Sequence, residues 1–367
     1  MSNEIEIKLM VQPYDGTAGG SVDGACFIHG MDGVLASLNA SVIRTAELEL
    51  ENSYYDTPDL ALYRAGIALR VRKTGSETEG TIKTRRMSSG GIHVHPEYNV
   101  PLSEKPDVPD LRMFPEHIFA EIDVDAVQKE LYENMAQSCR RHIWLVSFMD
   151  AEIELSFDRV AYKTSDGGTV AGTELELELK KGGVTALQKF AGELTDAVYA
   201  GRIARFRPES LSKMHRAAIY AGISELKLPS GNEIFGKEAD SDGACGTEKA
   251  FAGLMSATGR IASVIYLGPE GRNEETAKMA LDMIWRCFRA LAAMQVPADS
   301  DIFGQYAELR DILRKRISGL SEEGTSDVMH FHNLADEMAA LDGILTDRDF
   351  IRVILEINFA GLRGEKA

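Results

Sequence analysis

The hexapeptide Glu4-Ile5-Glu6-Ile7-Lys8-Leu9 alternates strictly between charged and apolar residues. Because successive side chains of a β-strand point to opposite faces, this stretch predicts a strand with one charged face and one apolar face. The same alternation returns in residues 47–51, 68–73, 80–83, 92–102, 141–148, 153–162 and 173–180. Clusters of Gly, Asp, Ser or Pro separate most of these stretches, as turns require. We count about eight strands, the smallest number that comfortably closes a barrel.

Helical segments are expected both between the strands and after them. Three interrupt the strands, near residues 31–42, 124–135 and 184–199. Beyond residue 223, a stretch rich in Gly, Pro, Ser and Asp is typical of a linker. Apolar residues then recur at spacings of three and four, which indicates amphipathic helices near residues 246–266, 273–295, 303–318, 331–343 and 347–360. We therefore predict an α+β chain: an eight-stranded antiparallel barrel with flanking helices in residues 1–225, a linker in 226–245 and an all-α region in 246–367.

Composition and charge exclude several classes of protein. A hydrophobic fraction of 44% is ordinary for a folded globular chain. The net charge of −17 disfavours binding to nucleic acid or to an anionic membrane. The four cysteines form no C-x-x-C pair, which favours reduced thiols over a zinc site or a disulfide framework. No secretory signal or membrane span is evident, so we expect a soluble cytoplasmic protein. P-loop, G-x-G-x-x-G and G-x-S-x-G motifs are absent.

The charged faces of the expected strands sort by sign. Some strands carry mostly carboxylates: Glu4 and Glu6; Glu152, Glu154 and Asp158; Glu174, Glu176 and Glu178. Others carry mostly cations: Arg70 and Arg72; Lys83; Arg141. One interpretation is that these faces are solvated and form ordinary cross-strand ion pairs. The other is that the intervening apolar residues pack under helices outside the barrel, in which case the charged faces point inward.

Inward-facing charges of both signs would suit phosphate chemistry. A ring of carboxylates is costly unless cations neutralise it, and Mg²⁺ or Mn²⁺ prefers carboxylate oxygens. Arginine and lysine on the opposite wall suit a phosphate chain, because Arg offers two parallel donors and Lys a point charge. Carboxylates for a metal and cations for an oxyanion in one enclosed space therefore indicate phosphoryl transfer.

Several motifs, in order along the chain, resemble those of the CYTH superfamily of triphosphate tunnel metalloenzymes. The opening Glu4-x-Glu6-x-Lys8 is the family's signature. The later matches are Tyr54-Tyr55-Asp56-Thr57-Pro58, Gly66-x-x-Leu69-Arg70-x-Arg72, Thr81-Ile82-Lys83, the segment from Gly90 to Val100, Arg141-x-x-Trp144, Ile153-Glu154-Leu155-x-x-Asp158, Glu174-Leu175-Glu176-Leu177-Glu178-Leu179 and Ser210-Leu211-Ser212-Lys213. The resemblance covers residues 1–222 and is strongest to bacterial inorganic triphosphatases, which carry a helical domain after the barrel.

This resemblance implies an eight-stranded tunnel, a requirement for Mg²⁺ or Mn²⁺, and hydrolysis of tripolyphosphate to pyrophosphate and phosphate. It assigns metal binding to Glu4, Glu6, Glu174 and Glu176. It assigns phosphate binding to Lys8, Arg70, Arg72, Lys83, Arg141 and Lys213. The catalytic acidic side, which would orient water or a second metal, consists of Glu97, Glu154 and Asp158. The expected partner is a small-molecule triphosphate, with no nucleic acid and no membrane.

The sequence departs from the family pattern in a few places and leaves alternatives open. His95 stands where relatives often carry Arg, and either His95 or Arg85 is a candidate substrate contact. Partner domains in this family are often helical CHAD domains, yet the C-terminal region, with His330 and His332, shows no clear CHAD motif. The same barrel would also suit an adenylyl cyclase, a thiamine or nucleoside triphosphatase, or a non-catalytic module that binds polyphosphate or nucleotide.

Overall fold

The structure is a computed structural model that describes residues 2–15, 22–84, 87–89, 91–223, 244–267, 274–294, 301–318 and 333–364, with the single residues 228, 320 and 331. Arg85, His330, His332 and most of the expected linker lie outside the described residues. In the described part of the chain, no helix combines the length and the apolar character that crossing a membrane requires.

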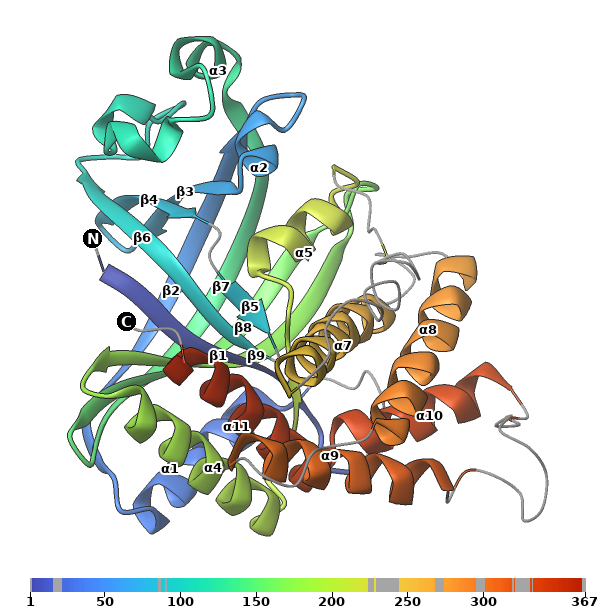
Figure 1. Ribbon diagram of the computed structural model, residues 1–367. Helices are drawn as coiled ribbons and strands as arrows, with labels where there is room; N and C mark the ends of the chain where they lie inside the picture. Colours follow the sequence, from blue (N-terminus) through green and yellow to red (C-terminus); the bar gives the residue numbers. More distant parts are fainter. Residues whose placement is uncertain are drawn as a thin grey trace.

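Eight antiparallel strands close into a barrel, as the alternation predicts (Figure 1). Each strand pairs with its neighbours in the order β1-β9-β8-β7-β2-β3-β4-β6, and β6 pairs back onto β1. Their bounds are β1 Ser2–Gln12, β2 Ser41–Asp56, β3 Ile67–Thr74, β4 Glu77–Thr84, β6 Ile92–Leu102, β7 Tyr132–Phe148, β8 Ala151–Lys163 and β9 Thr169–Lys181. Two short strands extend the sheet: β5 (Met87–Ser89) pairs with β6, and β10 (Arg205–Pro208) pairs with β1.

The helices within the barrel part are α1 (Gly24–Ser37), α2 (Ala61–Arg64), α3 (Val124–Glu130), α4 (Val184–Ala200) and α5 (Lys213–Tyr220). Two 3₁₀ turns, Leu111–Met113 and Glu116–Phe119, precede α3. The prediction for α4 is confirmed. The helix expected over 31–42 is wrong at both ends, because α1 already begins at Gly24 and residues from Ser41 onward pair with β7 as part of β2. The expected helix over 124–135 is wrong at its end, because residues from Tyr132 onward pair with β2 as part of β7. This long-range pairing overrides the local helical spacing.

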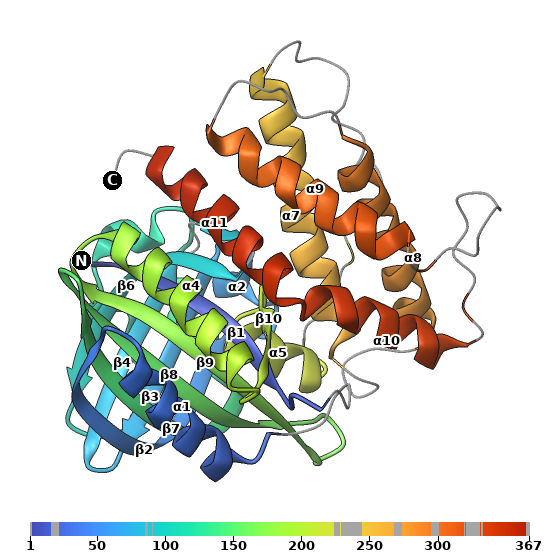
Figure 2. The same ribbon diagram turned by 90° about the horizontal axis from the view of Figure 1, so that it is seen from below.

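Helices cover the apolar outer face of the barrel. Ile7 and Leu9 of β1, together with Phe157 of β8, are fully buried in one core with side chains of α1 and α4. Figure 2 shows these two helices lying against the outside of the barrel. On another side, Leu69 and Val71 of β3 pack under the 3₁₀ turns and α3. Because helices take the apolar face, the alternating charged face of these strands is left to the barrel interior.

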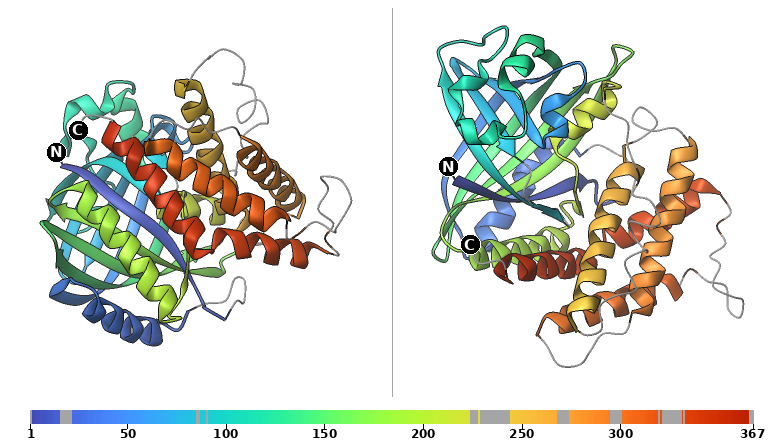
Figure 3. Two further views of the ribbon diagram at one scale, coloured as in Figure 1. Left: turned by 60° about the horizontal axis from the view of Figure 1, so that its bottom comes forward. Right: turned by 45° about the horizontal axis from the view of Figure 1, so that its top comes forward.

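Within the part of the chain that the structure describes, five helices follow the barrel, and all lie within a few residues of their predicted positions. They are α7 (Ala244–Ile265), α8 (Glu274–Ala293), α9 (Asp301–Ser318), α10 (Leu334–Leu345) and α11 (Arg348–Gly364). They form a hydrophobic core of their own, which includes Trp285 and Phe288. One face of α11 nevertheless belongs to the barrel core, through Ile351, Leu355 and Phe359, and α11 lies beside α4 (Figures 2 and 3).

Replacing Phe359 with alanine should therefore destabilise the barrel as well as the helices. Phe359 is fully buried in the barrel core, and a Phe→Ala change in such a position costs about 3–5 kcal/mol of the free energy of unfolding. Urea unfolding can be followed by fluorescence in a Trp285→Phe background, in which Trp144 of the barrel is the remaining tryptophan. The control is Met279→Ala on α8, whose side chain is 54% exposed. Equal midpoints for the two variants would contradict the shared core.

Candidate active site

The charged faces of β1, β8 and β9 point into the barrel. Glu6, Asp158 and Glu174 are each at most 3% exposed. Because helices cover the other face of their strands, these buried carboxylates face the barrel interior. The register places Lys8 opposite Glu176 and Asp158 opposite Glu174. The alternative of a solvated outer face is therefore wrong for these strands. On β2 the arrangement is reversed: Leu50 is buried inside, whereas the Glu49 side chain is 83% exposed.

Three carboxylates meet on this inner wall. Oxygen atoms of Asp158, Glu174 and Glu176 all lie within 4.8 Å of one another. Arg141 donates to Asp158 through Nε at 2.7 Å and through Nη2 at 2.6 Å, and its Nη2 also donates to Glu176 at 2.8 Å. These two parallel donors are the geometry in which an Arg–carboxylate pair is strongest.

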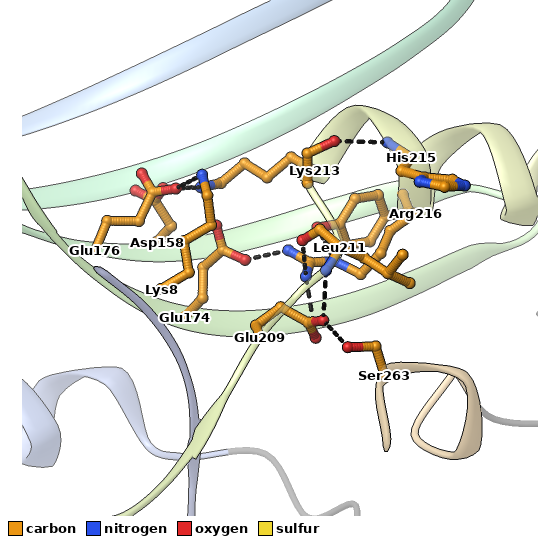
Figure 4. A network of polar contacts seen from close by, with 12 residues as sticks. Lys8, Asp158, Glu174, Glu176, Glu209, Leu211, Lys213, His215, Arg216 and Ser263 are labelled. Atoms are coloured by element: carbon orange, nitrogen blue, oxygen red, sulfur yellow. Dashed lines mark hydrogen bonds and ion pairs between the residues drawn. The ribbon is translucent and has the colours of Figure 1, made fainter. Parts of the chain in front are cut away.

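Lysines complete the neutralisation of this acidic group (Figure 4). Lys213 Nζ lies 2.8 Å from both Asp158 and Glu176 and also contacts Glu174. Lys8 Nζ lies 2.7 Å from Glu176 and 2.7 Å from Glu6. Although burial opposes ionisation, Lys213, Lys8 and Arg141 hold the pKa of Glu176 well below its usual range, so this carboxylate is charged and able to bind a cation.

Lys213 reaches the acidic group from the first residue of α5. Ser212 caps this helix by accepting a hydrogen bond from the backbone N–H of His215 at 3.2 Å. The body of α5 packs against inward-facing side chains of the barrel, among them Leu50, Cys139 and Tyr162. The chain thus returns to fill part of the barrel interior with its own helix, which explains why the inner face of β2 is apolar there.

A second charged group lies on β1, β4 and β6. Lys83 pairs with Glu4 and lies 3.3 Å from Glu97 Oε2. Burial opposes ionisation of Glu97, but Lys83 and a hydrogen bond with Glu4 lower the pKa of Glu97 to about 2. His95, which pairs with Glu4 across the strands, lies 3.2 Å through Nδ1 from the carbonyl oxygen of Thr84.

Arg70 and Arg72 on β3 differ from the other four cations that were predicted to bind phosphate. Among the described residues, neither arginine forms an ion pair with a carboxylate, whereas the other four do. Arg70 Nη2 donates to Thr81 Oγ1 at 3.1 Å, and its buried Nε has no partner. Arg72 Nε donates to Asn52 Oδ1 at 2.9 Å. Burial and the neighbouring charges of Arg70 and Arg141 lower the pKa of Arg72 to about 10. Two guanidinium groups so placed form a site for an anion.

The acidic group could bind a metal ion. Its donors are all carboxylate oxygens, the ligands that hard divalent cations such as Mg²⁺ and Mn²⁺ take. The composition of the group differs from the predicted metal-ligand set, since it includes Asp158, which the resemblance assigned to water or a second metal. Glu4 and Glu6 are not members of the group; each pairs with a lysine instead.

The remaining predicted residue, Glu154, lies farther along the barrel. It faces Glu178 across the β8–β9 ladder and sits 3.9 Å from Arg44. It stands four positions before Asp158, which corresponds to about 13 Å along a strand. Sequence reasoning missed Arg216, which contacts Glu174, and Glu209, which pairs with Arg216 (Figure 4). Arg216 follows Lys213 by three residues, a spacing that places both on one helix face and could have revealed it.

Comparison with known proteins relates the barrel to a known family of domains. Residues 32–210 match the family model of the CYTH domain. This match includes the barrel strands from β2 to β9, together with β10. The chain is also 30% identical, over 200 residues, to an inorganic triphosphatase of Haemophilus influenzae. The match covers 53% of this chain and 50% of that relative, so the chain spans about half the length of the protein it matches.

Solved structures show similarity to the same region. A Hippeastrum protein, described as a candidate adenylyl cyclase with a dominant triphosphatase activity, is 19% identical, covers 58% of this chain and 94% of its own, and gives a TM-score of 0.43. A Bacillus halodurans protein, described as a candidate adenylate cyclase, is 18% identical, covers 64% and 99%, and gives a TM-score of 0.33.

We expect His93 to make the barrel sensitive to acid. Its ring is buried, and Nε2 lies 2.8 Å from the carbonyl oxygen of Glu209. Burial, and next the positive charge of Lys8, lower the pKa of His93 to about 3. In the unfolded chain the same ring takes up a proton near its ordinary value of 6.5.

Between those two values only the unfolded state binds the proton, so stability should fall as the pH falls from 6.5 toward 3. One proton corresponds to about 1.4 kcal/mol per pH unit. In His93→Gln the free energy of unfolding should depend less steeply on pH by that amount. Urea unfolding at several pH values measures it, with His117→Gln at an exposed position as the control. An unchanged slope in His93→Gln would show that His93 titrates normally.

Proposed function

We propose that this protein hydrolyses the terminal phosphoanhydride bond of a small triphosphate inside the barrel, with inorganic tripolyphosphate as the substrate and pyrophosphate and phosphate as products. The observation that carries this proposal is the pair Arg70 and Arg72. Both are partly buried on β3 and have no ion-pair partner among the described residues, so their charge can complement that of the acidic group. A polyanion held there supplies the missing negative charge. The inorganic triphosphatase of Haemophilus influenzae, as a relative, supports the same activity.

In this proposal two groups of cations bind an extended phosphate chain. Arg70 and Arg72 bind oxygens of the chain, since their donors are not used by carboxylates. Lys8, Lys83, Arg141 and Lys213 sit between carboxylates and can share their donors with phosphate oxygens. Asp158, Glu174 and Glu176 would hold the divalent cation, with Glu6 beside them through the shared Lys8. Glu4 belongs to the second charged group with Lys83. When bound, that cation would neutralise charge on the phosphate oxygens.

Water then attacks the terminal phosphorus opposite the bridging oxygen. A bond forms between the water oxygen and phosphorus, the bridging P–O bond breaks, and the electron pair leaves with pyrophosphate. Glu97 can orient this water by accepting its hydrogen bond. Because the pKa of Glu97 is about 2, it is a weak base, and the proton ends on the phosphate product. Positioning and charge stabilisation therefore account for most of the acceleration, as phosphoryl transfer allows.

A substrate panel tests the proposal against its alternatives. Phosphate release is measured with tripolyphosphate, ATP, thiamine triphosphate and long-chain polyphosphate, each with Mg²⁺ and with Mn²⁺. We expect tripolyphosphate to give the highest kcat/KM and the activity to disappear with a chelator. Preference for ATP or thiamine triphosphate would favour a nucleotide enzyme on the same barrel. Tight binding with no phosphate release would indicate a binding module and end the proposal.

The substitution Arg72→Ala should lower kcat/KM for tripolyphosphate about 10²-fold or more, the usual loss when one oriented charge is removed from a transition state. Lys73→Ala is the matched control, because Lys73 is the next residue on the same strand and is exposed on the outer face. Glu4→Ala should cause a loss of similar size. Wild-type turnover in Arg72→Ala would show that the arginine pair does not bind the substrate.

A further inference from the structure

The acidic group of the barrel continues without interruption into the helical region. Arg216 contacts Glu174 through Nη2, and its Nη1 lies 3.2 Å from Glu209 Oε2. Arg207 Nη2 lies 3.4 Å from the same Glu209 oxygen. The other oxygen, Glu209 Oε1, accepts hydrogen bonds from the backbone N–H of Leu211 at 2.9 Å and from the hydroxyl of Ser263. Ser263 belongs to α7, the first described helix after the barrel (Figure 4).

We call these connected charges the ion network, and their signs balance. Its cations and carboxylates are equal in number, and their side chains are at most 11% exposed. The members are Lys8, Arg141, Arg207, Lys213 and Arg216 with Glu6, Asp158, Glu174, Glu176 and Glu209. In such a network the position of each charge depends on its neighbours, because removing one partner leaves a buried charge uncompensated.

Ser263 is well placed to hold Glu209. Its hydroxyl has one proton and two acceptors within reach, Glu209 Oε1 and the carbonyl oxygen of Gly259. A hydrogen bond to an ionised carboxylate is about twice as strong as one to a neutral carbonyl, so the proton goes to Glu209. Ser263 Oγ also accepts from the backbone N–H of Ser210 at 3.3 Å, which fixes the loop between Glu209 and α5.

A second set of contacts holds the same surface of α7 against β10. The guanidinium of Arg207 lies 4.1 Å from the ring centre of Tyr266, the residue just after α7. Tyr266 donates to Asp342 of α10 at 2.8 Å, and Asp342 pairs with Arg205 of β10 at 2.9 Å. Both arginines of β10 therefore contact residues of the helical region as well as residues of the barrel part. A shift of α7 would disturb the contacts of both Arg207 and Glu209.

We propose that the helical region completes the active site of the barrel, with Ser263, Glu209 and Arg216 as positioning residues that fix the carboxylate of Glu174 and the ammonium of Lys213. None of the three touches the substrate in this scheme. Ser263 orients Glu209, Glu209 orients Arg216, and Arg216 holds one oxygen of Glu174, whose other oxygen contacts Lys213. The inference rests on the proposed function for its effect on turnover, whereas its effect on metal binding can be measured separately.

The first test measures Mn²⁺ binding to the substrate-free full chain by calorimetry. Loss of a group that orients a metal ligand typically weakens affinity about 10- to 100-fold, so Ser263→Ala should weaken Mn²⁺ binding about tenfold. Ser263→Thr keeps the hydroxyl and should restore it. The matched control is Thr258→Val, which removes another buried hydroxyl of α7 that donates to Leu254 inside the helix. Wild-type Mn²⁺ affinity in Ser263→Ala, or no Mn²⁺ binding by the wild-type chain, would overturn the inference.

The second test compares turnover. Ser263→Ala and Glu209→Gln should each lower kcat for tripolyphosphate, and the double variant should be no worse than the more damaged single variant, because both act through one chain of contacts. Additive losses would overturn the inference. If the wild-type chain releases no phosphate from any triphosphate, the proposed function fails, and the Mn²⁺ comparison still decides whether Ser263 positions the acidic group.

Discussion

The structure depends on burying many charges inside a closed barrel. An ionised side chain removed from water is tolerated only when opposite charges and hydrogen bonds surround it, and here Arg141, Lys8 and Lys213 each contact two or more carboxylates. This constraint explains why the strands sort by sign. It also explains why helices cover the outside, since the apolar halves of the same strands must leave water as well.

Much of the barrel could be predicted because strand alternation is a local property of the sequence. Glu4, Glu6 and Lys8 share one face whatever the rest of the chain does. The reversed face of β2, with Leu50 inside, could not be predicted, because it results from α5 packing into the barrel from a segment far along the chain. The end of α3 was missed for a similar reason: pairing with β2 determines where β7 begins.

The inward direction of the charged side chains on β1, β8 and β9 could be predicted from the sequence, but their grouping and the presence of Arg216 and Glu209 could not. The sequence shows which residues point inward, whereas only the register between strands brings Asp158 beside Glu174 and separates Glu154 from both. Arg216 and Glu209 belong to the network because the chain turns back beneath the barrel after β10, which periodicity does not reveal. The helical region is likewise joined to the barrel by α11 and by Ser263, contacts that connect residues far apart in sequence.

The ion network contains equal numbers of positive and negative charges, and this balance affects how the barrel would bind divalent cations from solution. A structural metal site usually holds its protein together, so that chelation unfolds it. Here lysine and arginine already neutralise Asp158, Glu174 and Glu176, and the scaffold is complete before any ion arrives. A divalent ion that bound here would compete with built-in ammonium and guanidinium groups. Its occupancy would then follow the free ion concentration around the protein, and the fold would not change when the ion left.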